Sequence, residues 1–316
     1  MFRNYLKRKI TPFLETIALL IRKGMELAGT DEDVKLLLSK ILINNLKQSK
    51  SIKNIADAEF KVFSQFGDDG IIQFLVDRAK IFPGEQKFVE FGVETYRESN
   101  TRFLLTNNNW KGLIMDADRC DINSIKKWKD YWKYDLTAVT AFVTKKNINN
   151  LFNKYGFNKN IGLLSIDVDG NDYWLWEAFT LTKPIIVMVE YNSVFGNKKA
   201  ITIPYDEKFY RTKAHYSNLY WGTSLKALCR LAKRKEYVFL GCNSSGNNAY
   251  FVRKDRKGNL VEQTPDVGYV EARYRESRDK AGNLTFLCGK ERLEKIKNMK
   301  VYDVDSNKIY QLKNVM

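Results

Sequence analysis

The sequence comprises 316 residues, of which 53 are Lys or Arg and 37 are Asp or Glu, and its formal net charge is +16. With 44% hydrophobic and 13% aromatic residues it can bury a large core, which excludes a chain that is disordered throughout. No run of about 18 apolar residues predicts a transmembrane helix. The four cysteines are widely spaced without a C-x-x-C pair, which argues against a zinc site and indicates a reducing compartment.

Residues 1–63 are predicted to form an N-terminal helical segment, including a helix over 31–47. Four basic residues between Arg3 and Lys9 precede an apolar run over 13–21. Glu15 interrupts this run and no small-residue cleavage site follows it, so the pattern disfavours a signal peptide. A basic amphipathic helix that packs on the core, or else touches a membrane surface peripherally, fits the pattern better.

Beyond residue 64, short apolar strands alternate with amphipathic helices. This alternation predicts a mostly parallel sheet with helices on both faces. Because only a turn rich in Gly, Asn and Ser separates the last two strands, we expect them to form an antiparallel hairpin at the edge of the sheet. The result is an α/β, Rossmann-like fold with the layout of the seven-stranded class I methyltransferase sheet. The predicted strands cover 87–93, 112–115, 138–143, 161–166, 184–189, 237–241 and 249–253.

The last part of the chain, 255–316, is highly charged and includes a predicted hairpin near 301–310. We interpret it as a C-terminal arm that extends a catalytic domain over 64–254. The excess of basic residues can form a surface that attracts nucleic acid, an anionic membrane or an acidic substrate. The alternative is a solvated basic surface without a partner. No segment interleaves Arg with aromatic residues, so we expect no specific nucleic-acid partner. The reducing compartment that the cysteines indicate predicts a cytoplasmic protein.

Candidate binding residues follow the predicted parallel strands. In open parallel sheets, ligands bind beyond the carboxyl ends of the strands. A glycine after the first strand lets the backbone approach a ligand, and an acid after the second can accept hydrogen bonds from ribose hydroxyls. The alternative is a turn glycine with a helix-capping aspartate. The residues at four strand ends are Glu90 and Gly92, Asp116 and Asp118, Asp167 and Asp169, and Glu190 and Asn192.

The residues after Gly92 discriminate between cofactors. Val93, Glu94, Thr95 and Tyr96 supply no further glycine, whereas a dinucleotide needs a glycine-rich turn for its pyrophosphate. Glu94 would also repel that phosphate. S-adenosylmethionine has no phosphate and carries a sulfonium cation, so the sequence favours it over NAD.

Acceptor oxygens crowd the end of the fourth predicted strand. Like charges this close need a cation or raised pKa values. Asp167, Asp169, Glu190 and Asn192 are therefore candidate ligands for Mg²⁺ or Mn²⁺, which prefer oxygen atoms. The competing interpretation is a turn in which Asp172 caps the next helix.

His215 is the single histidine of the chain and lies in a long loop of polar and aromatic residues. Its imidazole is a candidate catalytic base for a substrate hydroxyl near neutral pH, and Asp167 is a second candidate. The alternative for His215 is a structural role, with the ring packed in its loop.

Several segments in this order resemble the FkbM-type S-adenosylmethionine-dependent methyltransferases. The resemblance covers about 64–253 and implies a class I methyltransferase fold and O-methylation, often of sugars or polyketide-derived hydroxyls. It also implies that Glu90 and Gly92 lie by the methionine part of the cofactor and Asp116 by its ribose; Asp118 and Asp167 complete the predicted cofactor contacts. The segments that carry it are Ser64-Gln-Phe-Gly-Asp68, Phe88-Val-Glu-Phe-Gly-Val93, Ser99-Asn-Thr101, Gly112-Leu-Ile-Met-Asp116 and Leu164-Ser-Ile-Asp-Val-Asp-Gly170.

We therefore predict an S-adenosylmethionine-dependent O-methyltransferase that acts on a hydroxyl of a carbohydrate or another glycan-pathway substrate. Two alternatives stay open. One is a metal-dependent nucleotide-sugar glycosyltransferase, in which Asp167-Val-Asp169 holds the metal against a diphosphate. The other is a non-catalytic cofactor-binding or interaction domain whose basic surface docks on a membrane or a nucleic acid.

Overall fold

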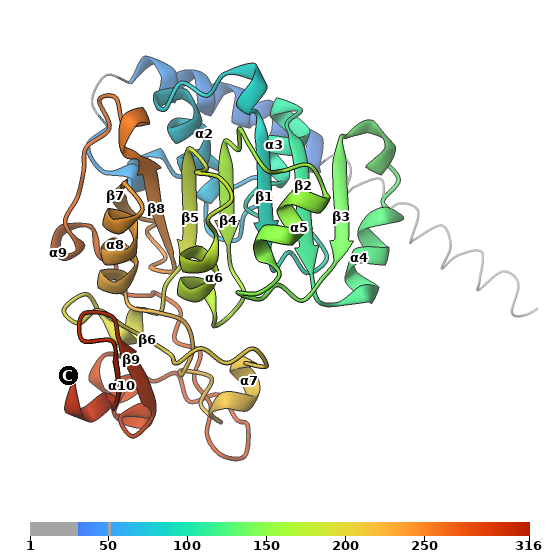
Figure 1. Cartoon of the computed structure of the whole chain (residues 1–316). Coiled ribbons are helices and arrows are strands. Elements are labelled where there is room, and N and C mark those ends of the chain that lie inside the picture. Colours follow the sequence, from blue (N-terminus) through green and yellow to red (C-terminus); the bar gives the residue numbers. More distant parts are fainter. Residues whose placement is uncertain (1–30, 50–51) are drawn as a thin grey trace, which may run out of the picture.

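A computed structural model describes residues 31–49 and 52–316 (Figure 1). Its main feature is a seven-stranded sheet in the order β3-β2-β1-β4-β5-β8-β7. The first five strands of this order are parallel, whereas β8 runs antiparallel to both of its neighbours. The strands are β1 (Lys87–Phe91), β2 (Lys111–Asp116), β3 (Leu136–Thr140), β4 (Leu163–Ile166), β5 (Ile186–Glu190), β7 (Tyr237–Cys242) and β8 (Asn248–Arg253).

This strand order is that of the Rossmann-like class I methyltransferase sheet, so the predicted fold is confirmed. The chain builds outward from β1 to β3 and then returns to place β4 on the other side of β1. Such a reversal leaves a crevice beyond the carboxyl ends of the two strands where it occurs, and ligands of open α/β sheets bind there. The topology therefore predicts a ligand site at the carboxyl ends of β1 and β4.

Helices cover both faces of the sheet (Figure 1). Along β1, Phe88 packs with α2, α3 and α4 on one face, while Val89 and Phe91 pack with α5, α6 and α8 on the other. The alternation follows from the two-residue period of a strand, and burial on both faces explains why the strands are almost continuously apolar. The helices are α2 (Asp68–Arg78), α3 (Arg102–Asn108), α4 (Arg119–Lys126), α5 (Ile148–Lys154), α6 (Asp172–Ala178) and α8 (Leu225–Arg234).

A second, three-stranded sheet lies beyond the carboxyl ends of the central strands (Figure 1). Its order is β10-β9-β6, so a strand from the predicted catalytic domain pairs with one from the predicted C-terminal arm. Buried apolar side chains from both segments form a common core beneath it, including Phe195, Ile201, Ile296 and Val301. The strands of this sheet are β6 (Ile201–Thr202), β9 (Lys300–Asp303) and β10 (Lys308–Gln311). Residues of α7 (Arg211–Ala214) and α10 (Lys290–Ile296) pack with its core, whereas α9 (Pro265–Gly268) lies beside β7 and α8.

Residues 31–48 form a helix. The predicted membrane contact of the N-terminus, between Arg3 and Lys9, lies outside the described residues. None of the helices within the described ranges combines the length and the apolar character needed to cross a membrane. Short 3-10 helices complete the fold at η1 (Ile55–Ala58), η2 (Pro83–Glu85), η3 (Tyr131–Lys133), η4 (Ser193–Phe195), η5 (Lys254–Arg256) and η6 (Leu312–Asn314).

Candidate active site

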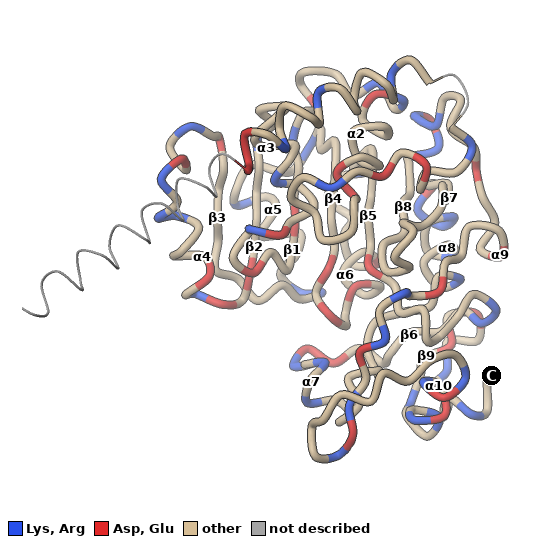
Figure 2. Tube along the Cα trace, turned by 180° about the vertical axis from the view of Figure 1, so that it is seen from behind, with Lys and Arg blue, Asp and Glu red and all other residues tan. Residues whose placement is uncertain are grey.

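A cleft of about 630 Å³ lies at the carboxyl ends of the parallel strands, where residues from β1, β2, β4 and β5 face residues from α7. Of the described residues that line it, eight are acidic and one, Arg211, is basic. Figure 2 shows acidic segments at these strand ends. A chain with a net charge of +16 therefore presents a negative cleft to its ligand. The acidic residues are Glu90, Glu94, Glu98, Asp116, Asp167, Asp169, Glu190 and Glu276.

Gly92 brings the end of β1 against the loop that follows β4. Its φ of +72° lies in the left-handed region, and a Cβ atom at this position would lie 1.7 Å from the carbonyl oxygen of Asp167. Only glycine tolerates both conditions. Gly92 lies after the first strand and lines the cleft. The absence of a side chain at Gly92 lets the backbone of Asp167 approach closely.

Glu90, on β1, is buried and binds the start of α3. Its Oε1 accepts a hydrogen bond from the backbone N–H of Asn100 at 2.9 Å, and its Oε2 accepts from the hydroxyls of Ser99 and Thr101 at 2.6 and 2.5 Å. Burial raises the pKa of Glu90 although these hydrogen bonds oppose the rise. Glu90 thus lines the cleft with its carboxyl group already engaged, and it holds β1 and α3 together.

Asp116 and Asp118, both predicted cofactor residues, have different places. Asp116 lines the cleft, and its oxygens accept from the backbone N–H groups of Asp118 at 2.8 Å and Glu94 at 2.9 Å, which leaves each oxygen a lone pair for a further donor. Asp118 is the N-cap of α4 and accepts from Cys120 at 2.6 Å and Asp121 at 3.3 Å. It does not line the cleft, so the structure gives it the helix-capping role that the sequence left as the alternative.

Asp167 and Glu190 form a coupled pair of carboxyl groups at the ends of β4 and β5. Each lines the cleft, and the two groups lie within hydrogen-bonding reach of each other. Burial, followed by the charges of Asp169 and Asp172, raises the pKa of Asp167 well above its ordinary value; burial and the charge of Asp167 do the same to Glu190. Two carboxyl groups buried this close to each other oppose the ionisation of both at once.

Asp172, the first residue of α6, shapes the turn after β4. Its Oδ1 accepts from the backbone N–H of Val168 at 2.8 Å, and its Oδ2 accepts from that of Gly170 at 3.0 Å. Burial raises its pKa to about 7. The alternative that the sequence left open is found in part: Asp172 closes the turn after β4, but the N-cap of α6 is Asn171, without a side-chain capping hydrogen bond.

The residues predicted to bind Mg²⁺ or Mn²⁺ have separate partners. Asp169 pairs with Arg211 at 2.9 Å, and the side-chain nitrogen of Asn192 donates to two backbone oxygens, both at 2.9 Å. Within the described residues, no group of three or more His, Cys, Asp or Glu side chains is arranged to hold a metal ion. The predicted set of four metal ligands is therefore not supported by the arrangement of these side chains.

Arg211, from α7, links segments that are far apart in the sequence. It pairs with Asp169, 42 residues away, and with Glu276 of the C-terminal arm at 3.0 Å, 65 residues away. Its guanidinium carbon lies 4.7 Å from the centroid of the Trp221 ring. Burial lowers the pKa of Arg211, but Asp169, Glu190 and Glu276 together hold it above its ordinary value. Sequence reasoning missed Arg211 and Glu276, because no local pattern marks such distant partners.

His215, the other candidate base, ends α7 and is not among the side chains that line the cleft. Its Nδ1 lies 2.8 Å from Oγ of Ser217, and its ring centroid lies 4.3 Å from that of Tyr216. Burial lowers the pKa of His215. The ring therefore has the loop-packing contacts of the alternative interpretation, and Asp167 is the candidate base that faces the cleft.

A buried polar network beneath the cleft fixes Asn248, which the sequence analysis did not select. Asp68 Oδ1 accepts hydrogen bonds from Nδ2 of Asn243 at 2.9 Å, from Nδ2 of Asn248 at 3.0 Å and from the hydroxyl of Tyr250. Asn248 begins β8, lies opposite Glu190 in the strand register and lines the cleft. The available signal was the run of polar residues in this turn, interpreted above only as a hairpin connection.

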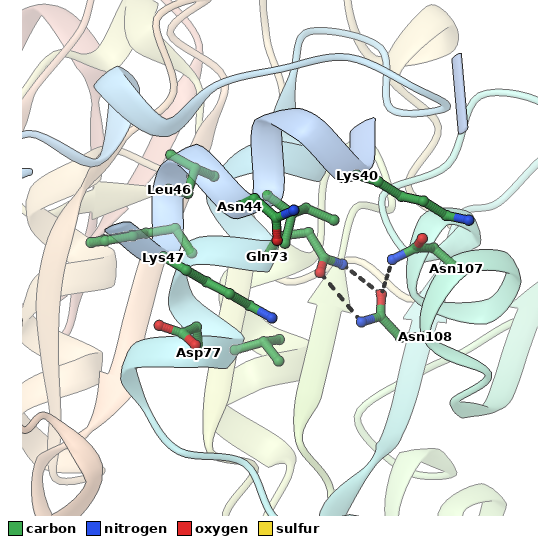
Figure 3. A pocket seen from close by; sticks show the side chains of 11 residues that line it. Lys40, Asn44, Leu46, Lys47, Gln73, Asp77, Asn107 and Asn108 are labelled. Atoms are coloured by element: carbon green, nitrogen blue, oxygen red, sulfur yellow. Dashed lines mark hydrogen bonds between the residues drawn. The ribbon is translucent and has the colours of Figure 1, made fainter. Parts of the chain in front are cut away.

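A second hollow, of about 390 Å³, lies between the helix at 31–48 and α2 (Figure 3). The side-chain amides of Gln73, Asn107 and Asn108 meet there and bond to one another. Asn107 and Asn108 end α3, which leads back to the amino end of β2. This hollow is therefore far from the strand ends that bind ligands in such sheets.

No protein-family model and no curated protein matches the sequence. Similar solved structures include an S-adenosylmethionine-dependent methyltransferase from Clostridium acetobutylicum, with 11% identity and a TM-score of 0.37 over 58% of this chain and 89% of that one. The protein PKMT2 of Rickettsia typhi in complex with AdoHcy has 12% identity and a TM-score of 0.37, over 57% and 52%. Human N-acetylserotonin methyltransferase in complex with SAM has 11% identity and a TM-score of 0.32, over 59% of this chain and 56% of that one. This chain thus spans little more than half the length of the last two.

The buried carboxyl groups predict that the fold loses stability as the pH rises. Burial raises the pKa of Asp69 to about 6 and that of Asp172 to about 7, from an ordinary value of 3.8. Between the ordinary pKa of 3.8, which applies to the unfolded state, and the raised native pKa, each group binds more protons in the native state. The free energy of unfolding therefore falls with rising pH. We expect a decrease on the order of 2 kcal/mol between pH 5 and pH 7 in urea titrations. An increase over that interval would contradict the assignment.

Proposed function

We propose that this protein is an S-adenosylmethionine-dependent O-methyltransferase. The observation that carries the proposal is the acidic cleft at the switch point of a class I methyltransferase sheet. S-adenosylmethionine carries a sulfonium and an ammonium against one carboxylate, so its net charge is positive and complements the cleft. When bound, it supplies an electrophilic methyl group on sulfur.

The side chains on the β1 and β2 side of the cleft fit the nucleoside end of this cofactor. Asp116 has lone pairs that can accept hydrogen bonds from ribose hydroxyls, as an acid after the second strand does in related folds. Ala117, Ala141 and Phe142 add apolar surface beside it for the adenine ring. Gly92 forms part of the floor toward β4.

The side chains on the β4 and β5 side fit the acceptor. We assign the catalytic base to Asp167, which faces the cleft beside Glu190. In its deprotonated form Asp167 would take the proton of an acceptor hydroxyl as the oxygen bonds to the methyl group and the methyl–sulfur bond breaks, which leaves S-adenosylhomocysteine. Positioning of the two reactants contributes much of the remaining acceleration. The acceptor class, a carbohydrate or another glycan-pathway hydroxyl, follows from the FkbM resemblance and is part of the proposal.

The nucleotide-sugar alternative fits the cleft less well. A nucleoside diphosphate needs cationic partners, yet Arg211 is the one basic residue in the described lining and it already pairs with Asp169 and Glu276. Eight acidic residues would repel the diphosphate. Asp169, the second acid of the D-x-D motif, is paired with Arg211 through its Oδ1.

Calorimetric titration tests the proposal with S-adenosylmethionine, S-adenosylhomocysteine and, for the alternative, UDP with Mg²⁺. Micromolar binding of the first two supports it, and metal-dependent UDP binding in their place overturns it. A screen for transfer of a labelled methyl group to sugars and amino sugars then identifies the acceptor. If none of these ligands binds, the alternative of a non-catalytic domain is favoured.

The Asp116→Ala variant is expected to bind S-adenosylhomocysteine about 10- to 100-fold more weakly, because charge-assisted hydrogen bonds to the ribose are lost. The Asp118→Asn variant is the matched control, since asparagine caps a helix as well as aspartate does and Asp118 does not line the cleft. Its affinity should stay within about twofold of the wild type. Equal affinities of the Asp116→Ala variant and the wild type would remove the ribose assignment.

A further inference from the structure

The part of the cleft beside β5 and β8 contains hydrogen-bond acceptors that no group in residues 31–49 and 52–316 satisfies. Oε2 of Glu190 and Oδ1 of Asn248 are buried without a hydrogen-bond partner. The exposed fractions of these residues are 7% and 2%, and both line the cleft. Because Glu190 and Asn248 are direct partners in the antiparallel register, their side chains project from the same face of the sheet.

The orientation of the Asn248 amide is fixed by its neighbour. Its nitrogen donates to Oδ1 of Asp68 at 3.0 Å, and a carboxylate accepts but does not donate. The amide oxygen must therefore point away from Asp68, as an acceptor. Leaving a buried acceptor unsatisfied costs about 1–3 kcal/mol, so a ligand that donates to both oxygens would be stabilised here.

The charges around these oxygens select the kind of donor. Asp167, Asp169 and Asp172 all act on Glu190 with negative charge, and Arg211 opposes them. Arg211 is already paired with Asp169 and Glu276. A ligand that brings both N–H groups and a positive charge therefore matches the subsite better than a neutral hydroxyl does.

We infer that Glu190 and Asn248 form a subsite for a primary ammonium group carried by the methyl acceptor. The inference rests on the proposed function and specifies its substrate as an amine-bearing compound, such as an amino sugar. An ammonium has three N–H donors, so it can donate to both side chains and leave Asp167 free to act as the base. The subsite lies over β5 and β8, three and four strands away from β2, where Asp116 is assigned to the cofactor. For this reason we assign the ammonium to the acceptor and not to the methionine part of the cofactor.

The test compares glucosamine with glucose, which differ in the amine, by titration in the presence of saturating S-adenosylhomocysteine. The wild type should bind glucosamine at least about tenfold more tightly than glucose. The Glu190→Gln variant, which keeps the shape of the side chain, should lose this preference and retain its affinity for S-adenosylhomocysteine. The Glu98→Gln variant removes an exposed cleft charge away from the subsite, and it should retain the preference.

Equal affinities for glucosamine and glucose would overturn the inference. Weaker S-adenosylhomocysteine binding by Glu190→Gln would overturn it too, since the ammonium would then be that of the cofactor. Failure of the wild type to bind S-adenosylhomocysteine would instead count against the proposed function.

Discussion

The Gly92→Ala variant is expected to lose at least about 3 kcal/mol of its free energy of unfolding and to bind no S-adenosylhomocysteine. The added Cβ would lie 1.7 Å from the carbonyl oxygen of Asp167, an atom of the backbone that cannot rotate away. Relief requires the end of β1 to separate from the end of β4, and those two ends form the floor of the cleft. Stability and binding should therefore fall together. Urea titration and calorimetry measure the two losses.

Gly156→Ala separates steric conflict from backbone strain. Gly156 has a φ of +76°, close to that of Gly92, but a Cβ atom there would have no neighbour within 4 Å. The left-handed conformation alone costs about 1–2 kcal/mol for a residue other than glycine. We expect a loss of this size, with unchanged binding. A Gly92→Ala variant no less stable than Gly156→Ala would show that the contact with Asp167 relaxes without cost.

The fold was predictable because its determinants are local or follow from topology. The apolar runs that became β1 to β5 are bounded by turns and alternate with amphipathic helices, which defines a parallel sheet. The position of Asp116 and Asp167 in one cleft then follows, since parallel strands end at the same edge of the sheet. The short polar turn before Asn248 likewise predicted the antiparallel edge.

The roles of individual carboxyl groups were not predictable in the same way. An aspartate after a strand has the same local sequence whether it caps a helix, as Asp118 does, or faces a ligand, as Asp116 does. Glu90 is engaged by Ser99 and Thr101 only because α3 begins beside β1.

Contacts between distant segments escaped prediction for a related reason. Pairing of β6 with β9 joins segments about one hundred residues apart, and no periodicity in either segment specifies the other. The same pairing places the C-terminal arm beside the cleft, where Glu276 meets Arg211. The cleft residues Arg211 and Glu276 were therefore identified only from the structure.

The Asp167→Asn variant is expected to lower the rate of methyl transfer about 100-fold or more and to leave the affinity for S-adenosylhomocysteine within about threefold of the wild type. An amide has the shape of the carboxyl group but cannot take a proton from the acceptor. The measurement is turnover with the acceptor identified by labelled-methyl transfer. The Asp118→Asn variant, in which the helix cap is kept, should transfer methyl groups at the wild-type rate.

The pH dependence of the wild type distinguishes a base from a residue that only shapes the cleft. Burial, with the charges of Asp169 and Asp172, raises the pKa of Asp167, and the base acts in its deprotonated form. Turnover should therefore rise with pH and level off, with an apparent pKa above the ordinary value of an aspartate. This rise should be absent from the residual activity of Asp167→Asn. A variant with reduced turnover but the wild-type pH profile would place the base elsewhere, and His215→Ala would then be the next variant to measure.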